Sequence, residues 1–488
     1  MVKDLRDFLA EVDAIGELET FKGAHWNHEI GAVTELVAEK GSGRGGPACL
    51  FDDIEGYPSG FRVLSNTFGS IERSRITLGK PEGTTAMEMV DQWRKDMKAE
   101  PWSDEGGSGD GTTLVEDPTP EVAPILENVD AGDDVDVTKF PVPVWHAQDE
   151  DNRYIGTGCT ILTKDPDTGW VNLGVYRSSI IDEQTVTMGI WPGKDGLVTM
   201  RKYHERGEDC PIAMVVGLDP WTWLASTITL HRQESEYEVA GWLQGEPIPV
   251  IEAPDTGLPI PANAEIALEG YLPPLSEERC TDGPFGEWPG YSTPPHPDLP
   301  VMHVTNVMHR DDPILLGQPP LRPPALYTLG VPVRTAGGVW NQLEDGGVPS
   351  VTGVWSHVIE RPMFLVVSIE QEYAGHAKQA GLGAVSTPNG SYGGRYVVVV
   401  DDDVDVTNLD EVLWAMCTRC RAEDVEIVEG VYTSPLDPLV QDRERPTSGR
   451  VIVDATRPYD EEFPEAIAFP DDYREEVREK WGLDAVGI

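Results

Sequence analysis

The sequence predicts a mixed α/β (α+β) protein built from three parts, and three observations lead to this prediction. The chain has 488 residues, more than a single hydrophobic core usually supports. Short strand-like runs separated by turns fill its middle, which is typical of a β-barrel-like domain. Longer apolar runs followed by helical patterns fill its last third, which is typical of α/β structure. We expect an N-terminal α/β unit at 1–113, a central domain at 114–312 and a C-terminal α/β domain at 313–488.

The N-terminal unit is predicted to open with a helix. Apolar residues recur at helical spacing between an N-cap aspartate and a glycine that ends the helix: Asp4, Leu5, Phe8, Leu9, Val12 and Gly16. Two short strands are expected at 48–51 and 62–64, on either side of a Gly-Tyr-Pro turn. Residues 103–113 are rich in Gly, Ser and Asp, which predicts a mobile loop at the end of this unit.

The central domain is predicted to consist mainly of short strands. Apolar Ile266 and Leu268 flank Ala267 and follow Glu265, a pattern typical of an antiparallel strand with one buried face. The expected strands lie at 155–163, 170–176, 185–190, 212–216 and 264–268.

The C-terminal domain is predicted to alternate buried strands with helices. Residues 364–367 and 396–401 are apolar runs, and a helical pattern follows at 408–420. This helix carries Cys417 and Cys420, the one CxxC pair in the chain. It has no second pair and does not follow a strand, so we predict core packing rather than a redox or metal role. All six cysteines are expected to be reduced thiols.

The charge of the chain argues against nucleic acid as a partner. Lys and Arg number 37 against 85 Asp and Glu, so the net charge of −48 repels a phosphate backbone. The acids are spread along the whole chain, and 14 Trp, 14 Tyr and 10 Phe indicate a packed protein. We therefore hypothesise a halophilic surface whose charges salt screens. Folding as complete at low ionic strength as in molar KCl would contradict this hypothesis.

No membrane partner is expected either. The chain has no stretch of about 18 consecutive apolar residues, which is the length that a membrane span needs. Its first six residues already carry charge, unlike an apolar signal region. We therefore expect a cytoplasmic protein.

Two acids at the ends of a tight turn offer a place for proton chemistry. They are Asp282 and Glu287, joined by Gly-Pro-Phe-Gly. Close, partly buried carboxyl groups have their pKa values pushed apart, which lets one of them donate a proton. Arg177, about a hundred residues upstream, has the side chain best shaped to hold a substrate carboxylate. The alternative is that all three are ordinary residues of an acidic chain.

A second set of residues could bind a divalent ion. Glu236 opens a helical stretch, and Asn172 could supply a second oxygen ligand. The alternative for Glu236 is an acid favoured by the dipole of a helix N-terminus. Asn172 and Arg177 lie five residues apart in a strand-like segment, so they face opposite sides unless the chain bends between them. A bulge or turn is implied if both are functional.

In their combination and their order along the chain, these motifs resemble those of the UbiD family of decarboxylases, which use prenylated FMN. The resemblance covers nearly the whole chain, from Asp4 to Thr456. It implies a central flavin-binding split β-barrel and a C-terminal domain that helps to assemble homodimers or homohexamers. The motifs that carry it are Asn172 to Arg177, Glu236, Asp282 to Glu287, the run from Val398 to Val406, and Trp414 to Arg419.

The resemblance also implies roles for individual residues. The catalytic network falls on Arg177, Asp282 and Glu287. Asn172 and Glu236 would hold a divalent ion, usually manganese, against the cofactor phosphate, and K⁺ is a possible second cation. The positions implied to bind the cofactor are Thr157, Asn172, Val175, Tyr176, Arg177, Ser226, Thr227 and Glu236.

Two positions depart from the family pattern. We place the third metal ligand, a His in the family, at Gly193, so the ion would be bound more weakly, through water or through Asp195. The first acid of the turn is usually Glu, and here Asp282 is shorter by one methylene, a difference of roughly 1 Å that can alter rate or substrate.

The activity implied is removal of CO2 from an aromatic, heteroaromatic or α,β-unsaturated carboxylic acid through a covalent adduct with the cofactor. Arg177 would hold the carboxylate of this small substrate, Glu287 would donate the proton and Asp282 would tune Arg177. A flavin prenyltransferase is implied as the partner for maturation. Two alternatives remain open, namely a flavin oxidoreductase on the same barrel and a non-catalytic relative that binds flavin.

Overall fold

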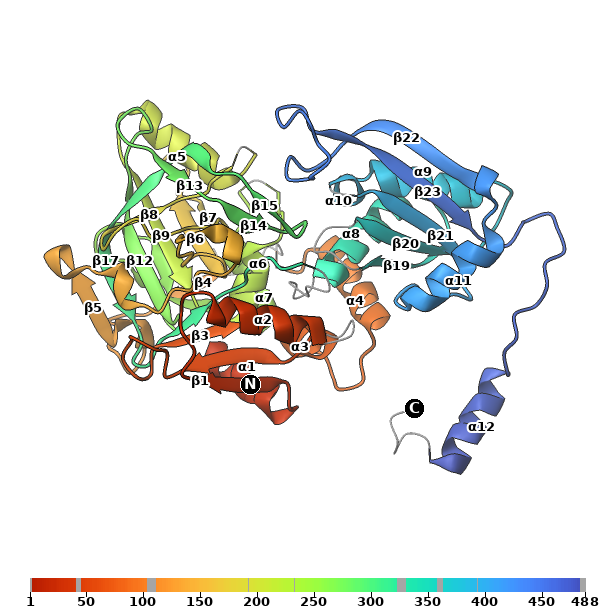
Figure 1. The fold of residues 1–488 in the computed structure, drawn as a ribbon, viewed down its shortest axis with the longest axis horizontal. Coiled ribbons are helices and arrows are strands. Elements are labelled where there is room, and N and C mark those ends of the chain that lie inside the picture. Colours follow the sequence, from red (N-terminus) through yellow and green to blue (C-terminus); the bar gives the residue numbers. More distant parts are fainter. Residues whose placement is uncertain are drawn as a thin grey trace.

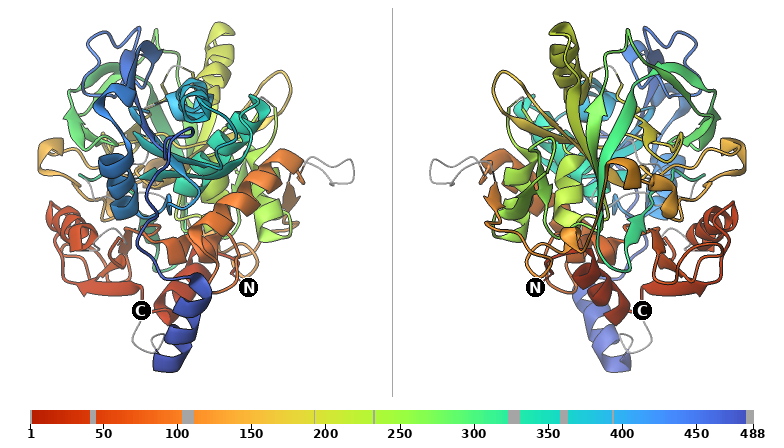
Figure 2. Two further views of the ribbon diagram at one scale, coloured as in Figure 1. Left: turned by 90° about the vertical axis from the view of Figure 1, so that its right-hand side faces the viewer. Right: turned by 90° about the vertical axis from the view of Figure 1, so that its left-hand side faces the viewer.

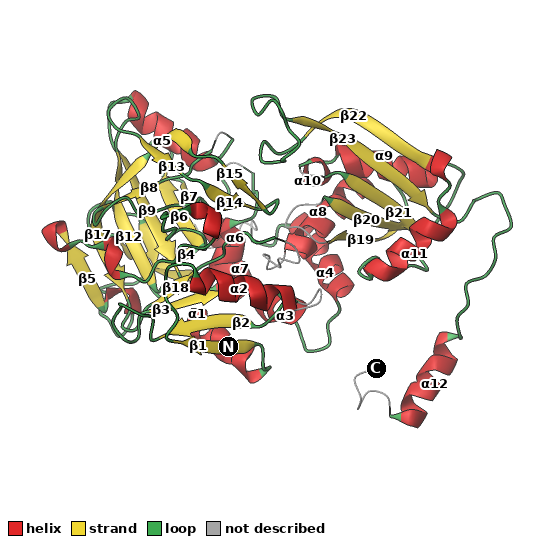
Figure 3. Cartoon of the chain, in the orientation of Figure 1, coloured by secondary structure: helices red, strands yellow, loops and turns green. Residues whose placement is uncertain are grey.

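The fold has three regions, each built around its own sheet (Figure 1). The structure is a computed structural model, and it describes residues 2–40, 45–102, 111–191, 193–231, 233–322, 331–357, 363–392 and 394–482. Figure 3 shows strands concentrated in the central region and helices flanking the other two sheets. The predicted mixed α/β class is confirmed.

The N-terminal region contains a four-stranded sheet in the order β1, β2, β3, β18. β18 lies after the central region in sequence and pairs in parallel with β3. The predicted first helix is confirmed, because the Asp4 side chain accepts a hydrogen bond from the Asp7 N–H and the apolar face of the helix is buried. The elements are α1 (Leu5–Ala14), β1 (Leu18–Lys22), α2 (Glu29–Lys40), β2 (Ala48–Asp52), β3 (Arg62–Ser65), α3 (Ile71–Thr77), α4 (Ala86–Ala99) and β18 (Ile314–Leu316).

The central region is dominated by an antiparallel sheet in the order β5, β17, β12, β9, β6, β7, with β8 paired to β17. The strands of the described residues follow an open path, so the barrel in the sequence-based expectation stays a prediction. The strands of the sheet are β5 (Asn128–Ala131), β6 (Cys159–Lys164), β7 (Val171–Gly174), β8 (Thr185–Thr187), β9 (Cys210–Val216), β12 (Ile266–Leu272) and β17 (Val301–His309).

Smaller strands and three helices surround the central sheet. Residues 103–110 of the predicted mobile loop lie outside the described residues, and its last two residues, Thr112 and Thr113, belong to β4. The elements are β4 (Thr112–Leu114), β10 (Ile248–Glu252), β11 (Pro259–Pro261), β13 (Cys280–Asp282), β14 (Phe285–Glu287), β15 (Tyr291–Thr293), β16 (His296–Leu299), α5 (Asp195–Glu205), α6 (Pro220–Ser226) and α7 (Glu236–Gln244).

The expectation of a strand with one exposed face at 264–268 is wrong. Glu265, at the entry to β12, is as fully buried as its apolar neighbours. The reason is a long-range ion pair, in which Nε and Nη2 of Arg6 donate to the two carboxylate oxygens of Glu265 at 2.8 Å each. Because Arg6 of α1 reaches Glu265, a charged residue in the alternating pattern does not mark a solvent-exposed face of this strand.

The C-terminal region is a five-stranded sheet in the order β19, β20, β21, β23, β22, with helices on both faces. Alternate residues of β21 pack into different cores: Val397 and Val399 join the main core, whereas Val398 and Val400 pack with the helix α11. The elements are α8 (Val331–Asp345), β19 (Val351–His357), β20 (Phe364–Ile369), α9 (His376–Ser386), α10 (Pro388–Ser391), β21 (Tyr396–Asp401), α11 (Leu409–Arg419), β22 (Val425–Tyr432), β23 (Thr447–Ala455) and α12 (Asp471–Trp481).

The predicted core role of the CxxC pair is wrong for Cys417 and holds in part for Cys420, which packs against the hydrophobic cluster under α11. Cys417 is exposed and Cys420 only partly buried, because α11 buries the face that carries Val412 and Ala415. Helical spacing shows which residues share a face but not which face meets the sheet. The six cysteines are free thiols, as expected.

Helix α4 links the N-terminal region to the C-terminal one, because it packs along α8 (Figure 1). The Arg94 guanidinium lies 4.2 Å from the centroid of the Trp340 ring and pairs with Glu344 at 3.1 Å. At the far end of the chain, α12 follows an extended segment and projects beyond the rest of the molecule (Figure 2). Among the described residues, no helix has the length and apolar character needed to cross a membrane.

Candidate active site

Arg177 lies between the two acids of the predicted turn. Its Nε donates to Asp282 Oδ2 at 2.7 Å, and its Nη1 pairs with Glu287 Oε1. Asp282 ends β13 and Glu287 ends β14, and Gly283, at φ +101°, allows the tight turn between these strands. The structure therefore brings together all three residues of the predicted catalytic network.

Strand alternation does not constrain Asn172 and Arg177 relative to each other, because the strand ends between them. β7 stops at Gly174, so Arg177 lies beyond the sheet and alternation no longer sets the direction of its side chain. Asn172 remains within the strand and is buried. The expected bulge or turn is absent, since residues 175–179 show neither, and the end of the strand takes its place.

Asp282 and Glu287 lie in different surroundings. The side chain of Asp282 is fully buried, and its Oδ1 accepts from the hydroxyls of Ser179 at 3.0 Å and Thr187 at 3.2 Å. The side chain of Glu287 keeps 11% of its surface exposed. Asp282 is thus fixed from several sides, whereas Glu287 remains within reach of a small molecule.

Aromatic rings cover the guanidinium. The centroid of the Phe285 ring lies 4.9 Å from Arg177 Cζ, and that of Trp191 lies 5.5 Å away, both within cation–π range. Burial alone would lower the pKa of Arg177, but the charges of Glu287 and Asp282 raise it. The arginine therefore stays a cation in a largely dry site.

Tyr154 completes the wall behind the turn. Its ring centroid lies 4.4 Å from that of Phe285, and its hydroxyl donates to the Pro284 carbonyl at 3.1 Å. Burial, and then the charge of Asp282, raise the pKa of this phenol far above its ordinary value. Sequence reasoning missed Tyr154, Ser179, Thr187 and Phe285 as parts of the site, and only Phe285, inside the turn motif, carried a local signal.

The predicted metal ligands also lie close together. Glu236, at the start of α7, accepts a hydrogen bond at its Oε2 from the N–H of Leu173, the neighbour of Asn172. Burial, with a smaller contribution from the charge of Asp195, raises the pKa of Glu236 to about 7. Among the described residues no cation pairs with this carboxyl group, and the side-chain amide nitrogen of Asn172 has no hydrogen-bond partner. The carboxyl group without a cation suits a positive ion, whereas the unpartnered amide N–H groups suit an acceptor such as a phosphate oxygen.

Asp195 lies close enough for its charge to act on this group. It opens α5, and its charge acts on both Glu236 and Tyr176. Tyr176 accepts at its hydroxyl from the Gly196 N–H at 3.3 Å, and burial raises its pKa to about 12. Gly193, the predicted place of the missing His, precedes the helix at φ +89° with no atom within 4 Å of an added Cβ.

The remaining predicted cofactor positions line the same part of the central sheet. Thr157 Oγ1 accepts from the backbone N–H of Gln318 at 3.0 Å, and Ser226 accepts from Thr160 at 2.9 Å. Thr227, at the end of α6, receives the guanidinium of Arg334 from the C-terminal region on its carbonyl. Val175 is partly buried. The side-chain amide nitrogen of the buried Gln318 has no partner among the described residues, a second polar group free for a ligand.

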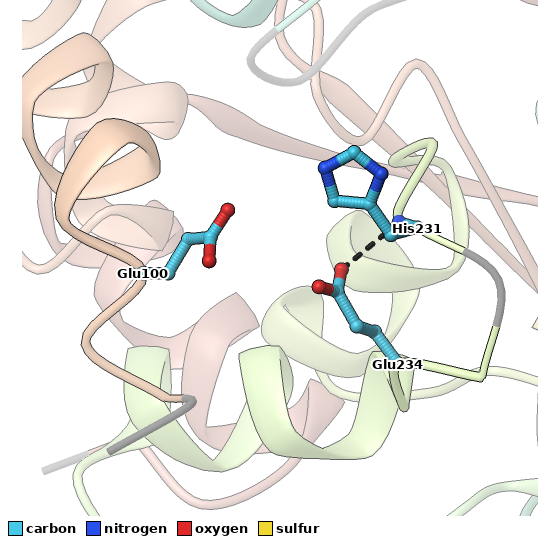
Figure 4. A group of neighbouring side chains, drawn as sticks. All are labelled: Glu100, His231 and Glu234. Atoms are coloured by element: carbon cyan, nitrogen blue, oxygen red, sulfur yellow. Dashed lines mark hydrogen bonds between the residues drawn. The ribbon is translucent and has the colours of Figure 1, made fainter.

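A separate group of possible metal ligands lies nearby, formed by Glu100, His231 and Glu234 (Figure 4). One ligand atom of each lies within 4.8 Å of the others, and Glu234 accepts from the backbone N–H of His231 at 2.9 Å. His231 is exposed and the two acids are only partly buried. Exposed acidic groups are frequent in so acidic a chain, so we assign no ion to this group.

Comparisons with known proteins match almost the whole chain. Family models for the N-terminal, Rift-related and C-terminal domains of 3-octaprenyl-4-hydroxybenzoate carboxy-lyase (UbiD) match residues 9–93, 118–323 and 328–455. The chain is 31% identical to a pyrrole-2-carboxylic acid decarboxylase of Pseudomonas aeruginosa over 98% of this chain and 95% of that protein. It is 30% identical to a phenolic acid decarboxylase of a Streptomyces species, over 93% and 92% of the two chains.

A solved structure is similar over nearly its full length. It is an evolved dimeric form of the UbiD-class enzyme HmfF from Pelotomaculum thermopropionicum in complex with prFMN. The two folds superpose with a TM-score of 0.79 at 27% identity, covering 97% of this chain and 98% of that one.

The buried carboxyl group of Glu236 makes the stability of the metal-free protein depend on pH. Its pKa is raised from 4.5 to about 7, so between these values the folded protein holds a proton that the unfolded chain has released. The free energy of unfolding therefore falls as pH rises through this window, by up to about 3 kcal/mol, since one pKa unit is about 1.4 kcal/mol. We expect Glu236→Gln to be more stable than wild type by a similar amount above pH 7, and equally stable at pH 4.5.

Chemical denaturation of chelator-treated protein in high salt measures this difference. Glu246→Gln, at an exposed position shortly after α7, is the control and should match wild type at both pH values. A difference in the free energy of unfolding between wild type and Glu236→Gln that does not change with pH would contradict the prediction.

Proposed function

The chain belongs to the UbiD family of carboxy-lyases, and from this premise we propose that it removes CO2 from an aromatic or heteroaromatic carboxylic acid, or from an α,β-unsaturated one, with prenylated FMN as cofactor. The observation that carries the proposal is Arg177, held between Asp282 and Glu287. The names of the relatives support the aromatic classes, since those proteins act on phenolic acids and pyrrole-2-carboxylic acid.

Arg177 is the residue that would bind the substrate carboxylate. Its Nε and Nη1 are taken by the two acids, while Nη2 makes no hydrogen bond within the described residues. One edge of the guanidinium is therefore held in place and another is left for a ligand. A second anion at this edge is favourable because the rings of Phe285 and Trp191 exclude water from the cation.

Glu287 would move the proton, and Asp282 would hold the arginine. Loss of CO2 leaves a carbon that needs a proton, and the donor must reach it directly. Glu287 is the partly exposed acid of the pair, whereas Asp282 is fully buried and occupied by Arg177, Ser179 and Thr187. When bound, prenylated FMN supplies the electron sink for the pair of electrons that CO2 leaves behind.

The cofactor would lie against the residues that the resemblance assigns to it. The unpartnered amide of Asn172, the isolated carboxyl of Glu236 and the unpartnered amide of Gln318 are groups that a polar cofactor and its cation would satisfy. The proposed cofactor-binding positions are Thr157, Asn172, Val175, Tyr176, Arg177, Ser226, Thr227 and Glu236.

We propose that Asp195 takes the place of the missing His ligand. With Asn172 and Glu236 it gives a set of oxygen ligands only, which suits hard divalent ions such as Mn²⁺ or Mg²⁺. A carboxylate in place of an imidazole also adds one negative charge beside the cofactor phosphate, so the ion would be needed to balance it. K⁺ is proposed as a second cation on the family resemblance alone.

A flavin oxidoreductase is the second candidate. No observation favours it over a carboxy-lyase, since a guanidinium clamped by two acids has no evident use in hydride transfer. The family match, and the prFMN in the HmfF complex, support the lyase.

Assembly and maturation complete the proposal. The segment before α12 and α12 itself leave large apolar side chains exposed, which a second copy of the chain would cover: Phe463, Ile467, Phe469, Tyr473 and Trp481. We therefore propose a homodimer or homohexamer, with a flavin prenyltransferase supplying the cofactor. We propose the units 1–113, 114–312 and 313–488, with the exceptions that β18 completes the N-terminal sheet and β4 pairs with β10 of the central region. The acidic surplus is proposed to require high salt.

The activity is tested on protein co-expressed with a flavin prenyltransferase and purified in high salt. We expect prenylated FMN by mass and absorbance, and CO2 release from phenolic acids or pyrrole-2-carboxylic acid. Arg177→Met should retain the cofactor and lose at least about 10²-fold in kcat/KM, since it removes a preorganised charge. Glu287→Gln should lose a similar factor, since it removes the proton donor.

Arg279→Met is the control for this experiment, because Arg279 also pairs with an acid near the turn but is exposed. It should react like wild type. Plain FMN without CO2 release would favour the oxidoreductase, and turnover by Arg177→Met at the wild-type rate would refute the proposed role of the arginine.

The metal site is tested by binding rather than by activity. Asp195→Asn should weaken Mn²⁺ binding at least about tenfold, the loss seen when even an outer-shell partner of a metal is removed. Asp195→His, which restores an imidazole near this position, should bind Mn²⁺ with an altered electron paramagnetic resonance spectrum. Metal content by mass spectrometry and titration of the Mn²⁺ signal measure both, and Glu208→Gln, exposed just after α5, is the control. Equal Mn²⁺ affinity of wild type and Asp195→Asn would exclude Asp195 as a ligand.

The assembly is tested by removing the arm that exposes apolar side chains. A chain ending at Glu462 should assemble into fewer copies than the full chain, as measured by sedimentation in high salt. The reason is that it lacks the residues that a second copy would cover. The double variant Ile467→Ser and Phe469→Ser should lower the number of copies likewise. An unchanged number of copies in both would show that the arm does not hold the assembly.

A further inference from the structure

His146 lies directly behind the strand that carries Glu287. It precedes the short 3₁₀ helix η4 (Ala147–Asp149), and the edge of its ring lies against Gly286, where an added Cβ would come within 2.8 Å of the ring. The side chain is 15% exposed. Neither the turn motif nor the family resemblance drew attention to this residue.

Both nitrogens of the imidazole face acceptors. Nδ1 lies 2.7 Å from Asp149 Oδ2, and Nε2 lies 2.6 Å from the carbonyl oxygen of Pro320. A neutral imidazole has a single N–H, so it can satisfy only one of the two. The geometry therefore points to an imidazolium that donates to a carboxylate on one side and to a backbone carbonyl on the other.

The contacts of His146 connect β14, which carries Glu287, to the segment near Gln318 and Thr157. Asp149 uses its second oxygen, Oδ1, to accept from the Gly286 N–H at 3.1 Å, next to Glu287. Pro320 follows Gln318, whose N–H binds Thr157. One cation thus joins β14 to the segment that leads from the central region toward α8.

The other groups around the ring favour the charged form. Glu35 of α2 acts on His146 through its negative charge, and Arg322 lies beyond it, 4.0 Å from Glu35. The ring of Phe285 meets the imidazole edge to face at 6.1 Å. Burial alone would lower the pKa of His146, but the hydrogen bond and charge of Asp149, with the Pro320 carbonyl, raise it above 6.5.

We propose that His146, in its charged form, is a positioning residue that locks β14 and so places Glu287 for proton transfer. When the ring loses its proton, one of its two hydrogen bonds is lost and the positive charge beside Asp149 disappears. The backbone N–H of His146 still donates to Asp149 Oδ2 at 3.1 Å, so Asp149 is held less firmly and its bond from the Gly286 N–H loosens. The role of Glu287 rests on the proposed function, but the lock itself does not.

Hydrogen exchange measured by mass spectrometry on the holoenzyme tests the lock without any substrate. After correction for the intrinsic pH dependence, the peptide that contains Gly286 should be protected near pH 6 and should exchange about ten- to a hundredfold faster once His146 is neutral, the factor expected for loss of a hydrogen bond to a charged group. The raised pKa gives the sign, since the protection is present at low pH and lost as pH rises through the folded-state value.

Two variants and a control sharpen the result. His146→Gln and Asp149→Asn should exchange fast at this peptide at every pH, with no titration. His303→Gln should behave like wild type, because His303 pairs with Glu278 in the same way but at the surface. Wild-type protection that stays flat as pH rises to about 9 would overturn the proposal even if both variants failed to fold.

The consequence for catalysis is read from pH profiles. If the decarboxylase activity is confirmed, the alkaline fall of kcat in wild type should be absent from His146→Gln, which should show a low kcat at all pH values with little change in KM. An alkaline limb identical in wild type and His146→Gln would show that the lock does not govern Glu287. A lack of CO2 release in every protein would refute the proposed function and leave the exchange result standing.

Discussion

The site depends on burying one guanidinium together with two carboxylates. Such a charge costs several kcal/mol to remove from water unless its partners hold it in good geometry, and here the acid Asp282, the acid Glu287 and two aromatic rings do so. β13, which pairs with β16, and β14, which pairs with β15, are joined by the turn that brings both acids to Arg177. The hydroxyls of Ser179 and Thr187 then fix the inner acid from the other side.

The central sheet supplies the rigidity that this arrangement needs. Most of its strands are buried on both faces, and buried acids in or beside it have partners distant in sequence, as Glu265 has in the charge of Arg6 and Glu269 in the side-chain amide of Asn306. Buried pairs of this kind are costly to break, so they favour one arrangement of the strands over others. The residues around Asn172 and Glu236 differ in this respect, because among the described residues no cation pairs with the Glu236 carboxyl group and the Asn172 amide nitrogen has no hydrogen-bond partner.

Much of the architecture could be predicted from the sequence, but its tertiary consequences could not. The first helix followed from the spacing of Leu5 to Val12. The buried state of Glu265 and the exposed state of Cys417 did not, because each depends on which distant element covers it. Arg177, Asp282 and Glu287 could be picked out because the turn motif and the family resemblance name them. Tyr154, Ser179, Thr187 and His146 have no local pattern, and only their proximity in the fold reveals them.

Because β18 belongs to the N-terminal sheet, this sheet can be completed only late in the synthesis of the chain. β3 ends at Ser65, but the strand that pairs with it begins at Ile314, so about 250 residues must leave the ribosome before this sheet has its last strand. At about 5–20 residues per second, the edge of β3 waits roughly ten to fifty seconds. An unpaired strand edge invites association with other chains. The large negative charge would then act during synthesis too. Nascent chains on neighbouring ribosomes of one mRNA would repel each other while the edge of β3 is still unpaired.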